Sequence, residues 1–257
     1  MKLINKTILI TGGATGIGFA LAAALAQRNN RVIITGRKLD KLREAAGQIP
    51  TLLYFQSDIT HPASVDELFA KLKHEGITVD VLFNNAGVLE LWDIAKDDLD
   101  TAAIFSKINT NLTGAIAVTQ RFIRQVNPEK QNLVVNMSTE AAILPVPILP
   151  LYSASKAGLN AFTLSLRHQF KGSHVKVVEI IPPAVETRMT TVDMNNTTKL
   201  AKPGDFAASI IRNIEAGKLH YAPSSNAAVL KLLKRFLPTL GINIIDKMSR
   251  KQLTSNI

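Results

Sequence analysis

The chain has 257 residues, of which 46% are hydrophobic, so it is long enough to bury one large core. It contains no cysteine, which excludes disulfides and thiolate metal sites. Its net charge of +10 is compatible with nucleic acid, an anionic membrane surface or anionic small molecules as partners. Because only 5% of the residues are aromatic, few side chains could stack on bases, and nucleic acid is the weaker prediction.

No segment resembles a signal peptide, and none reaches the about 20 consecutive apolar residues that a transmembrane helix requires. We therefore expect a cytoplasmic protein. The five histidines are scattered along the chain, and no residue pattern indicates a metal site.

Short runs rich in Val, Ile and Leu alternate with stretches of helical periodicity along residues 1–222. The runs predict buried strands, because strands that are covered on both faces lack polar alternation. The predicted strands are 7–11, 31–36, 51–55, 79–85, 132–138 and 175–182. This repetition predicts one α/β domain with a mainly parallel, doubly wound sheet and helices on both faces, the Rossmann fold.

A glycine-rich turn, TGGATGIG, joins the first strand to the first helix at residues 11–18. Glycines permit a tight turn, a close approach of the backbone to a pyrophosphate and close packing of the helix on the strand. The helix N-terminus adds N–H groups and a positive dipole end, which bind phosphate. The predicted dinucleotide-binding residues are Gly12, Thr15, Gly16, Ile17 and Gly18.

The end of the second strand distinguishes the two nicotinamide cofactors. NAD-binding proteins usually carry an acidic residue there, which bonds the ribose hydroxyls. This chain has Gly36, Arg37 and Lys38 instead. A guanidinium can bind a 2′-phosphate bidentately and stack on adenine, so Arg37 and Lys38 favour NADP(H) over NAD(H). The alternative is a solvated basic turn that starts a helix.

The third and fourth strands end in further candidates for cofactor binding. Asp58 could accept a hydrogen bond from the adenine amino group, with Ile59 supplying a backbone contact, or it could cap the following helix. Asn85, Ala86 and Gly87 suit a backbone crowded against a cofactor. A structural role for Asn85 is an equal alternative.

Tyr152 and Lys156 lie four residues apart, so they share one face of a helix. A free tyrosine has a pKa of about 10, and a nearby cation stabilises its phenolate and lowers that pKa. Such a pair can exchange protons with a carbonyl or alcohol oxygen. Prolines at 145, 147 and 150 predict that this helix starts at Tyr152. A surface pair without chemistry is the alternative.

The tail, residues 223–257, is predicted to form a basic amphipathic helical extension. Between residues 227 and 253, six Lys or Arg residues stand against one aspartate, a net charge of +5. Apolar residues recur at helical spacing up to Pro238. One interpretation is a helix that covers the domain or an oligomer seam. The other is weak contact with an anionic membrane surface.

Four motifs occur in the order TGGATGIG, NNAG (84–87), NTNLTG (109–114) and YSASK (152–156). In this order they resemble the short-chain dehydrogenase/reductase family, over roughly residues 5–222. The stretches ILITGGATGIG, PLYSASKAGLNAFTLSLR and IIPPAVETRM are most similar to its DltE-type oxidoreductases. The resemblance implies that Tyr152 is the acid/base, and that Lys156 tunes it and holds the nicotinamide ribose.

The family also has a serine, usually about 13 residues before the tyrosine, that hydrogen-bonds the substrate oxygen. Counting back from Tyr152 reaches Thr139 rather than Ser138, and either hydroxyl can donate. We favour Thr139, because neighbouring side chains of an extended segment point to opposite sides. The family's asparagine, which kinks the central helix and anchors a water near the lysine, matches Asn111.

The segment that follows the last predicted strand resembles the family's contact with the nicotinamide. By this resemblance Pro182 and Val185 would lie against the ring, and the Thr187 hydroxyl would meet the carboxamide. Residues 188–202 are polar and irregular, and we interpret them as a substrate lid, with disorder as the alternative.

Together these features predict an NADP(H)-dependent oxidoreductase that transfers hydride between nicotinamide and a small carbonyl or alcohol substrate. The alternatives are a cofactor-binding sensor with weak chemistry and a membrane-peripheral partner in cell-envelope synthesis. The family resemblance implies a homodimer or homotetramer formed through the two central helices, at about residues 102–126 and 152–171.

Overall fold

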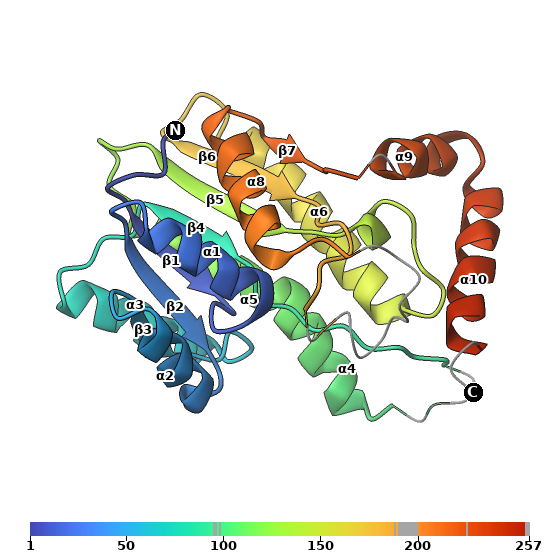
Figure 1. The fold of residues 1–257 in the computed structure, drawn as a ribbon, viewed down its shortest axis with the longest axis horizontal. Coiled ribbons are helices and arrows are strands. Elements are labelled where there is room, and N and C mark those ends of the chain that lie inside the picture. The colour runs from blue at the N-terminus through green and yellow to red at the C-terminus, as the bar shows by residue number, and fades with distance from the viewer. Residues whose placement is uncertain (95–96, 98, 188, 190–199, 225, 255–257) are drawn as a thin grey trace.

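A computed structural model describes residues 1–94, 97, 99–187, 189, 200–224 and 226–254. In these residues, seven strands form one parallel sheet in the order β3-β2-β1-β4-β5-β6-β7 (Figure 1). The strands are β1 (Thr7–Thr11), β2 (Arg31–Gly36), β3 (Leu53–Gln56), β4 (Val81–Asn84), β5 (Asn132–Met137), β6 (Val175–Ile180) and β7 (His220–Tyr221). The order reverses between β1 and β4, and in open α/β sheets ligands bind beyond the carboxyl ends of the strands at such a point.

The six predicted strands are confirmed, with ends that differ by at most two residues. β7 was not predicted, because its two residues, His220 and Tyr221, contain no apolar run. It adds to β6 in parallel, with Glu179 opposite His220.

Helices cover both faces of the sheet (Figure 1). They are α1 (Gly16–Ala26), α2 (Leu39–Gln48), α3 (Pro62–His74), α4 (Thr101–Ile108), α5 (Gly114–Ile123), α6 (Pro150–Gln169), α8 (Pro203–Glu215), α9 (Asn226–Phe236) and α10 (Pro238–Thr254). A π-helical turn, η1 (Asn109–Thr113), joins α4 to α5, and a 3₁₀ turn, η2 (Glu140–Ala142), follows β5. The doubly wound fold is therefore confirmed.

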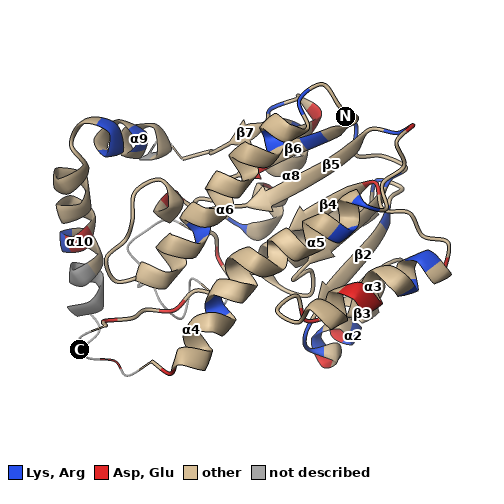
Figure 2. Ribbon diagram, turned by 180° about the vertical axis from the view of Figure 1, so that it is seen from behind, with Lys and Arg blue, Asp and Glu red and all other residues tan. Residues whose placement is uncertain are grey.

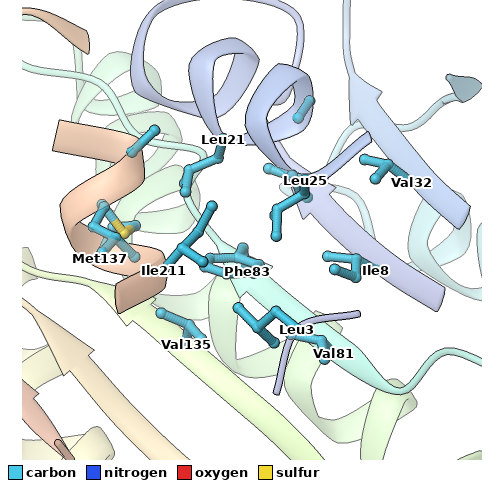
Figure 3. Packing of buried hydrophobic residues seen from close by; sticks show 14 of the residues in the cluster. Leu3, Ile8, Leu21, Leu25, Val32, Val81, Phe83, Val135, Met137 and Ile211 are labelled. Atoms are coloured by element: carbon cyan, nitrogen blue, oxygen red, sulfur yellow. The ribbon is translucent and has the colours of Figure 1, made fainter. Parts of the chain in front are cut away.

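Two apolar layers hold the helices on the sheet. One layer packs α1, α2 and α8 on one face through residues such as Leu21, Phe83 and Ile211 (Figure 3). The other packs α3, α5 and α6 on the opposite face, with Phe69 and Phe122 fully buried. Each strand of the sheet centre is buried on both sides, which explains its continuous apolar sequence.

The helix that carries Tyr152 and Lys156 starts earlier than predicted. α6 begins at Pro150, not at Tyr152. Proline is compatible with the first helical position, because its missing N–H would have no intrahelical partner there. Tyr152 still lies in the first turn, and Val146 N–H donates to Ser153 Oγ at 3.1 Å, which ties the proline-rich loop to the helix.

The C-terminal helices α9 and α10 follow β7 and lie beyond the end of the sheet toward which β6 and β7 point, with α10 set crosswise to α9 (Figure 1). We call these two helices the C-terminal hairpin. α9 ends at Phe236, as the Pro238 signal predicts, and Pro238 opens α10. No helix in the described part of the chain is long and apolar enough to cross a membrane.

Candidate active site

A cavity of about 280 Å³ lies at the carboxyl ends of the strands. Fifteen of the predicted site residues line it: Gly12, Thr15, Gly16, Ile17, Arg37, Asp58, Ile59, Asn85, Ala86, Gly87, Ser138, Tyr152, Lys156, Pro182 and Thr187. The first motif and the tyrosine–lysine pair are 140 residues apart in the sequence, and the parallel sheet brings them to one cleft.

Five predicted residues do not line this cavity: Gly18, Lys38, Asn111, Thr139 and Val185. Sequence reasoning missed several that do: Thr35, Ser57, Val88, Thr110, Met137 and Met189. Thr35 and Met137 lie near the carboxyl ends of predicted strands. Because the carboxyl ends of parallel strands border the ligand site, this position could have predicted that both residues line the cleft.

The glycine-rich turn has the backbone that its sequence predicts. Gly12 and Gly16 have φ of +63° and +55°, in the left-handed region that favours glycine. A Cβ on Gly18 would stand 2.3 Å from Gly12 O, so Gly18 allows the turn to fold onto α1. The Asn85 amide donates to the carbonyls of Thr11 and Gly12, both at 3.1 Å. Asn85 therefore has a structural role and also lines the cleft.

Residues at the ends of β2 and β3 form the far end of the cavity. In the described chain, the Thr35 hydroxyl is buried without a hydrogen-bond partner although Thr35 lines the cavity. Asp58 does not cap α3, whose N-cap position is His61, and its Oδ1 instead accepts from Thr60 N–H and Oγ1. Burial raises the Asp58 pKa, but hydrogen bonds from Thr60 and the charge of Arg37 hold it below its usual value. The unpaired Thr35 hydroxyl, the glycine backbone that lines the cavity and the Arg37 guanidinium are groups that fit a bound dinucleotide.

Two of the residues outside the cavity had been predicted to contact the cofactor directly. Val185 is 2% exposed and packs in the core beside α8, so it does not face the cleft. Its backbone forms an isolated bridge with Ala201. Lys38 is the N-cap residue of α2 and is not part of the cleft lining. The predicted lid, 188–202, lies almost entirely outside the described residues.

Tyr152 is partly buried and lies beside Thr139. Burial raises the pKa of Tyr152 above its ordinary value, and a hydrogen bond with the Thr139 side chain offsets part of that rise. Thr139 is extended, with φ −163° and ψ 161°, so we expect its side chain and that of Ser138 to point to opposite sides; of the two residues, Ser138 lines the cavity. The Ser138 hydroxyl lies next to the Glu179 carboxylate.

Lys156 is 4% exposed, and burial lowers its pKa to about 8. Its Nζ donates to Met137 O at 2.8 Å, at the end of β5. The net pKa of Tyr152 is raised because burial of the phenol dominates, and the expectation that Lys156 stabilises the phenolate stays a prediction. The helix places the two side chains on one face, but both have lost much of their contact with water.

Asn111 lies in the π-helical turn that interrupts the central helix. Its Oδ1 accepts from Val88 N–H at 2.8 Å, and its Nδ2 donates to Val88 O and to Ser155 Oγ. A Cβ on Gly87 would stand 3.2 Å from Asn111 Oδ1 and 3.5 Å from Lys156 Nζ. Asn111 therefore fixes the chain after β4 next to Lys156 without itself lining the cavity.

A buried acid that the sequence analysis did not single out lies behind the site. Glu179 is 1% exposed and accepts hydrogen bonds from Asn160 on α6 and from His220 on β7. The opposite nitrogen of His220 lies 3.0 Å from Lys231 Nζ on α9. A charged residue inside the apolar run VKVVEIIP was the signal that it has a partner.

Comparisons with known proteins point to one family. The sequence profile of the short chain dehydrogenase family matches residues 6–197. The uncharacterized oxidoreductase DltE of Bacillus subtilis is 34% identical over 187 residues, covering 73% of this chain and 74% of that protein. Human 17-beta-hydroxysteroid dehydrogenase type 3 is 28% identical, covering 95% and 85%.

A solved structure is also similar. The crystal structure of a short chain dehydrogenase from Burkholderia cenocepacia in complex with NADP superposes with a TM-score of 0.72 at 25% identity, covering 83% of this chain and 92% of that one. The extent of the family match and the shared fold lead to one conclusion. The chain belongs to the short chain dehydrogenase family and is an oxidoreductase of that family.

Proposed function

We propose that the protein catalyses NADP(H)-dependent reduction of a carbonyl group or oxidation of the matching alcohol. The observation that carries the proposal is that Tyr152 and Lys156 line the same cleft as the glycine-rich turn, with the Thr139 side chain hydrogen-bonded to Tyr152. NADPH would supply the hydride. The protein would supply the proton and the binding geometry.

Each part of the cleft has a role in binding. The backbone around Gly12, Gly16 and Ile17, at the N-terminus of α1, would hold the pyrophosphate. Asp58 and Ile59 would border the adenine. Pro182 and Thr187 would border the nicotinamide at the end that carries Lys156, which would also hold the nicotinamide ribose.

Tyr152 would donate the proton as negative charge develops on the substrate oxygen. Its raised pKa keeps the phenol protonated at neutral pH, so it starts as an acid. Lys156, with a pKa of about 8, also carries its proton near pH 7 and would stabilise the phenolate that remains. The Thr139 hydroxyl contacts Tyr152 and would orient the substrate oxygen beside it.

Arg37 supports a preference for NADP(H). It lines the cleft close enough to affect the Asp58 carboxyl, and the described cleft lining has no acid at the end of β2. The variant R37D should raise the KM for NADPH and lower that for NADH, because a carboxylate repels a 2′-phosphate and binds ribose hydroxyls. K38D is the matched control, since Lys38 lies outside the lining and should change the preference less. Equal Michaelis constants before and after R37D would contradict this assignment.

The experiment for the reaction itself measures NADPH oxidation with a panel of aldehydes, ketones and quinones. We expect turnover of at least one compound, which Y152F abolishes while it still binds NADPH. Tight NADPH binding without turnover of any compound would favour the sensor alternative.

We also propose a homodimer or homotetramer built on the central helices. Phe105 on α4 and Leu164 on α6 are 63% and 45% exposed, so these helices offer apolar positions that a second copy of the chain would cover.

A further inference from the structure

The C-terminal hairpin, α9 and α10, exposes many large apolar side chains. These are Val229, Leu232, Phe236, Leu237, Leu240, Ile244 and Met248, each between 43% and 65% exposed. They make up half of the large apolar side chains that the described residues expose. Within each helix they recur at intervals of three or four residues, so they form a continuous stripe along it.

The inner face of the same hairpin is already packed. Ala227 is buried against Ile143 and Ile181. A Cβ on Gly241 would stand 2.9 Å from Leu144 Cδ2, so α10 lies directly on the loop before α6. The outer stripe is therefore a second apolar face, and it is not the surface that attaches the hairpin to the domain.

Positive charge borders the outer stripe. Lys234, Arg235 and Lys247 are exposed, and Figure 2 shows this basic colouring on α9 and α10. The Arg235 guanidinium lies over the Phe236 ring, 5.6 Å from its centroid, which joins the charge to the apolar stripe. Between residues 226 and 254 the sequence has one acid, Asp246.

We propose that this hairpin face docks on an anionic phospholipid surface. A helix that presents an apolar stripe with Lys and Arg beside it lies in the interface of such a membrane, where the stripe enters the acyl boundary and the cations meet lipid phosphates. A second copy of the chain is the poorer occupant, because a twofold interface would place this patch against itself and bring its cations together. Docking of this face does not depend on hydride transfer, so membrane binding can be measured without a substrate.

The test is flotation of the full chain with phosphatidylcholine vesicles and with vesicles that also contain phosphatidylglycerol. We expect the protein to float with the anionic vesicles and much less with the neutral ones, and salt should weaken the binding. L232E/F236E should lose most of the binding because it puts charge into the stripe. K234E/R235E/K247E should lose it because it removes the attraction to phosphate.

Two matched controls keep this test specific. I4E places a charge on an apolar side chain that is 44% exposed outside the hairpin, and K71E/K73E/K130E makes the same change in net charge elsewhere. Both should float like the unchanged chain, and circular dichroism should show every variant folded. Absence of flotation with anionic vesicles would overturn the proposal. Equal loss in the controls would overturn it too. So would light scattering in which L232E/F236E converts a dimer to a monomer without changing flotation.

Discussion

At the scale of single residues, the site depends on two ionisable groups, Tyr152, which is partly buried, and Lys156, which is almost fully buried. The sequence spacing predicts that Tyr152 and Lys156 share a helix face, but it cannot predict how much water each retains. That depends on Met137 and Thr139, which the fold brings to α6 from the end of β5. Burial then shifts each pKa toward the neutral form, to about 8 for Lys156.

Burying the Lys156 ammonium costs stability, so a variant without this charge should lose turnover without losing stability. The folded Lys156 pKa of about 8 lies below the ordinary value, so the cost is fully present below pH 8 and disappears as pH rises toward about 10.4. At roughly 1.4 kcal/mol per pKa unit, it amounts to about 3 kcal/mol, partly offset by the bond to Met137 O. K156M should lose turnover yet be no less stable than the parent near pH 7 in urea unfolding. Its relative stability should fall as pH rises above about 8. A K156M chain that is several kcal/mol less stable at neutral pH would contradict this assignment.

The neighbouring hydroxyls Ser138 and Thr139 should differ in their effect on turnover. Loss of a donor to the developing oxyanion typically costs about 10²–10³ in kcat. We expect T139A to show a loss of this size and T139S to recover most of it. S138A should keep more activity, because the Ser138 hydroxyl faces Glu179. A larger loss in S138A than in T139A would reverse their roles.

At the scale of elements, the strands and the first turn could be predicted from the sequence, whereas the contacts between distant elements could not. Runs such as TILIT and VKVVEI carry their burial pattern locally. α6 starts two residues before the predicted position, because proline suits the first helical turn and Pro150 therefore does not block the helix. The contacts of Glu179 involve side chains from α6 and β7, and through His220 they reach α9. No local sequence pattern relates these elements.

The Glu179 network predicts a pH-dependent link between these elements. Burial alone would raise the Glu179 pKa, but hydrogen bonds from His220 and Asn160 bring it below its ordinary value. The stability it contributes is therefore present above about pH 4.3 and is lost as pH falls through the folded pKa. In urea unfolding near pH 7, E179Q should lower the free energy of unfolding by about 1.5–3 kcal/mol. The difference in stability between E179Q and the unchanged chain should shrink in acid. The control is E67Q, because Glu67 is exposed on α3. A stability difference between E179Q and the unchanged chain that grows in acid would count against this network.

At the scale of the whole molecule, the parallel sheet explains why motifs far apart in the sequence serve one cleft. All the strands point the same way, so the turn after β1, the chain after β4 and the N-terminus of α6 meet at one edge (Figure 1). The order of the motifs was enough to predict this edge. It did not predict that Val185 turns into the core, because that depends on packing against α8.

The proposed oligomer also belongs to this scale. F105E/L164E places charges in the two exposed apolar positions of the central helices, so it should shift the protein toward the monomer in light scattering. I4E, on a similarly exposed apolar residue at the N-terminus, should leave the mass unchanged. An assembly that survives F105E/L164E intact must use another surface.

The most direct test of the central claim follows the hydride itself. The protein is incubated with NADPH that carries deuterium at the transferred position and with a carbonyl compound that supports turnover. Mass spectrometry then measures the deuterium content of the alcohol product. We predict one deuterium on the carbonyl carbon with the unchanged chain and no labelled alcohol with Y152F, although Y152F still binds NADPH. Labelled alcohol formed equally well by Y152F would contradict the proton-donor role of Tyr152. Failure of the unchanged chain to label any carbonyl compound would contradict the proposed reaction.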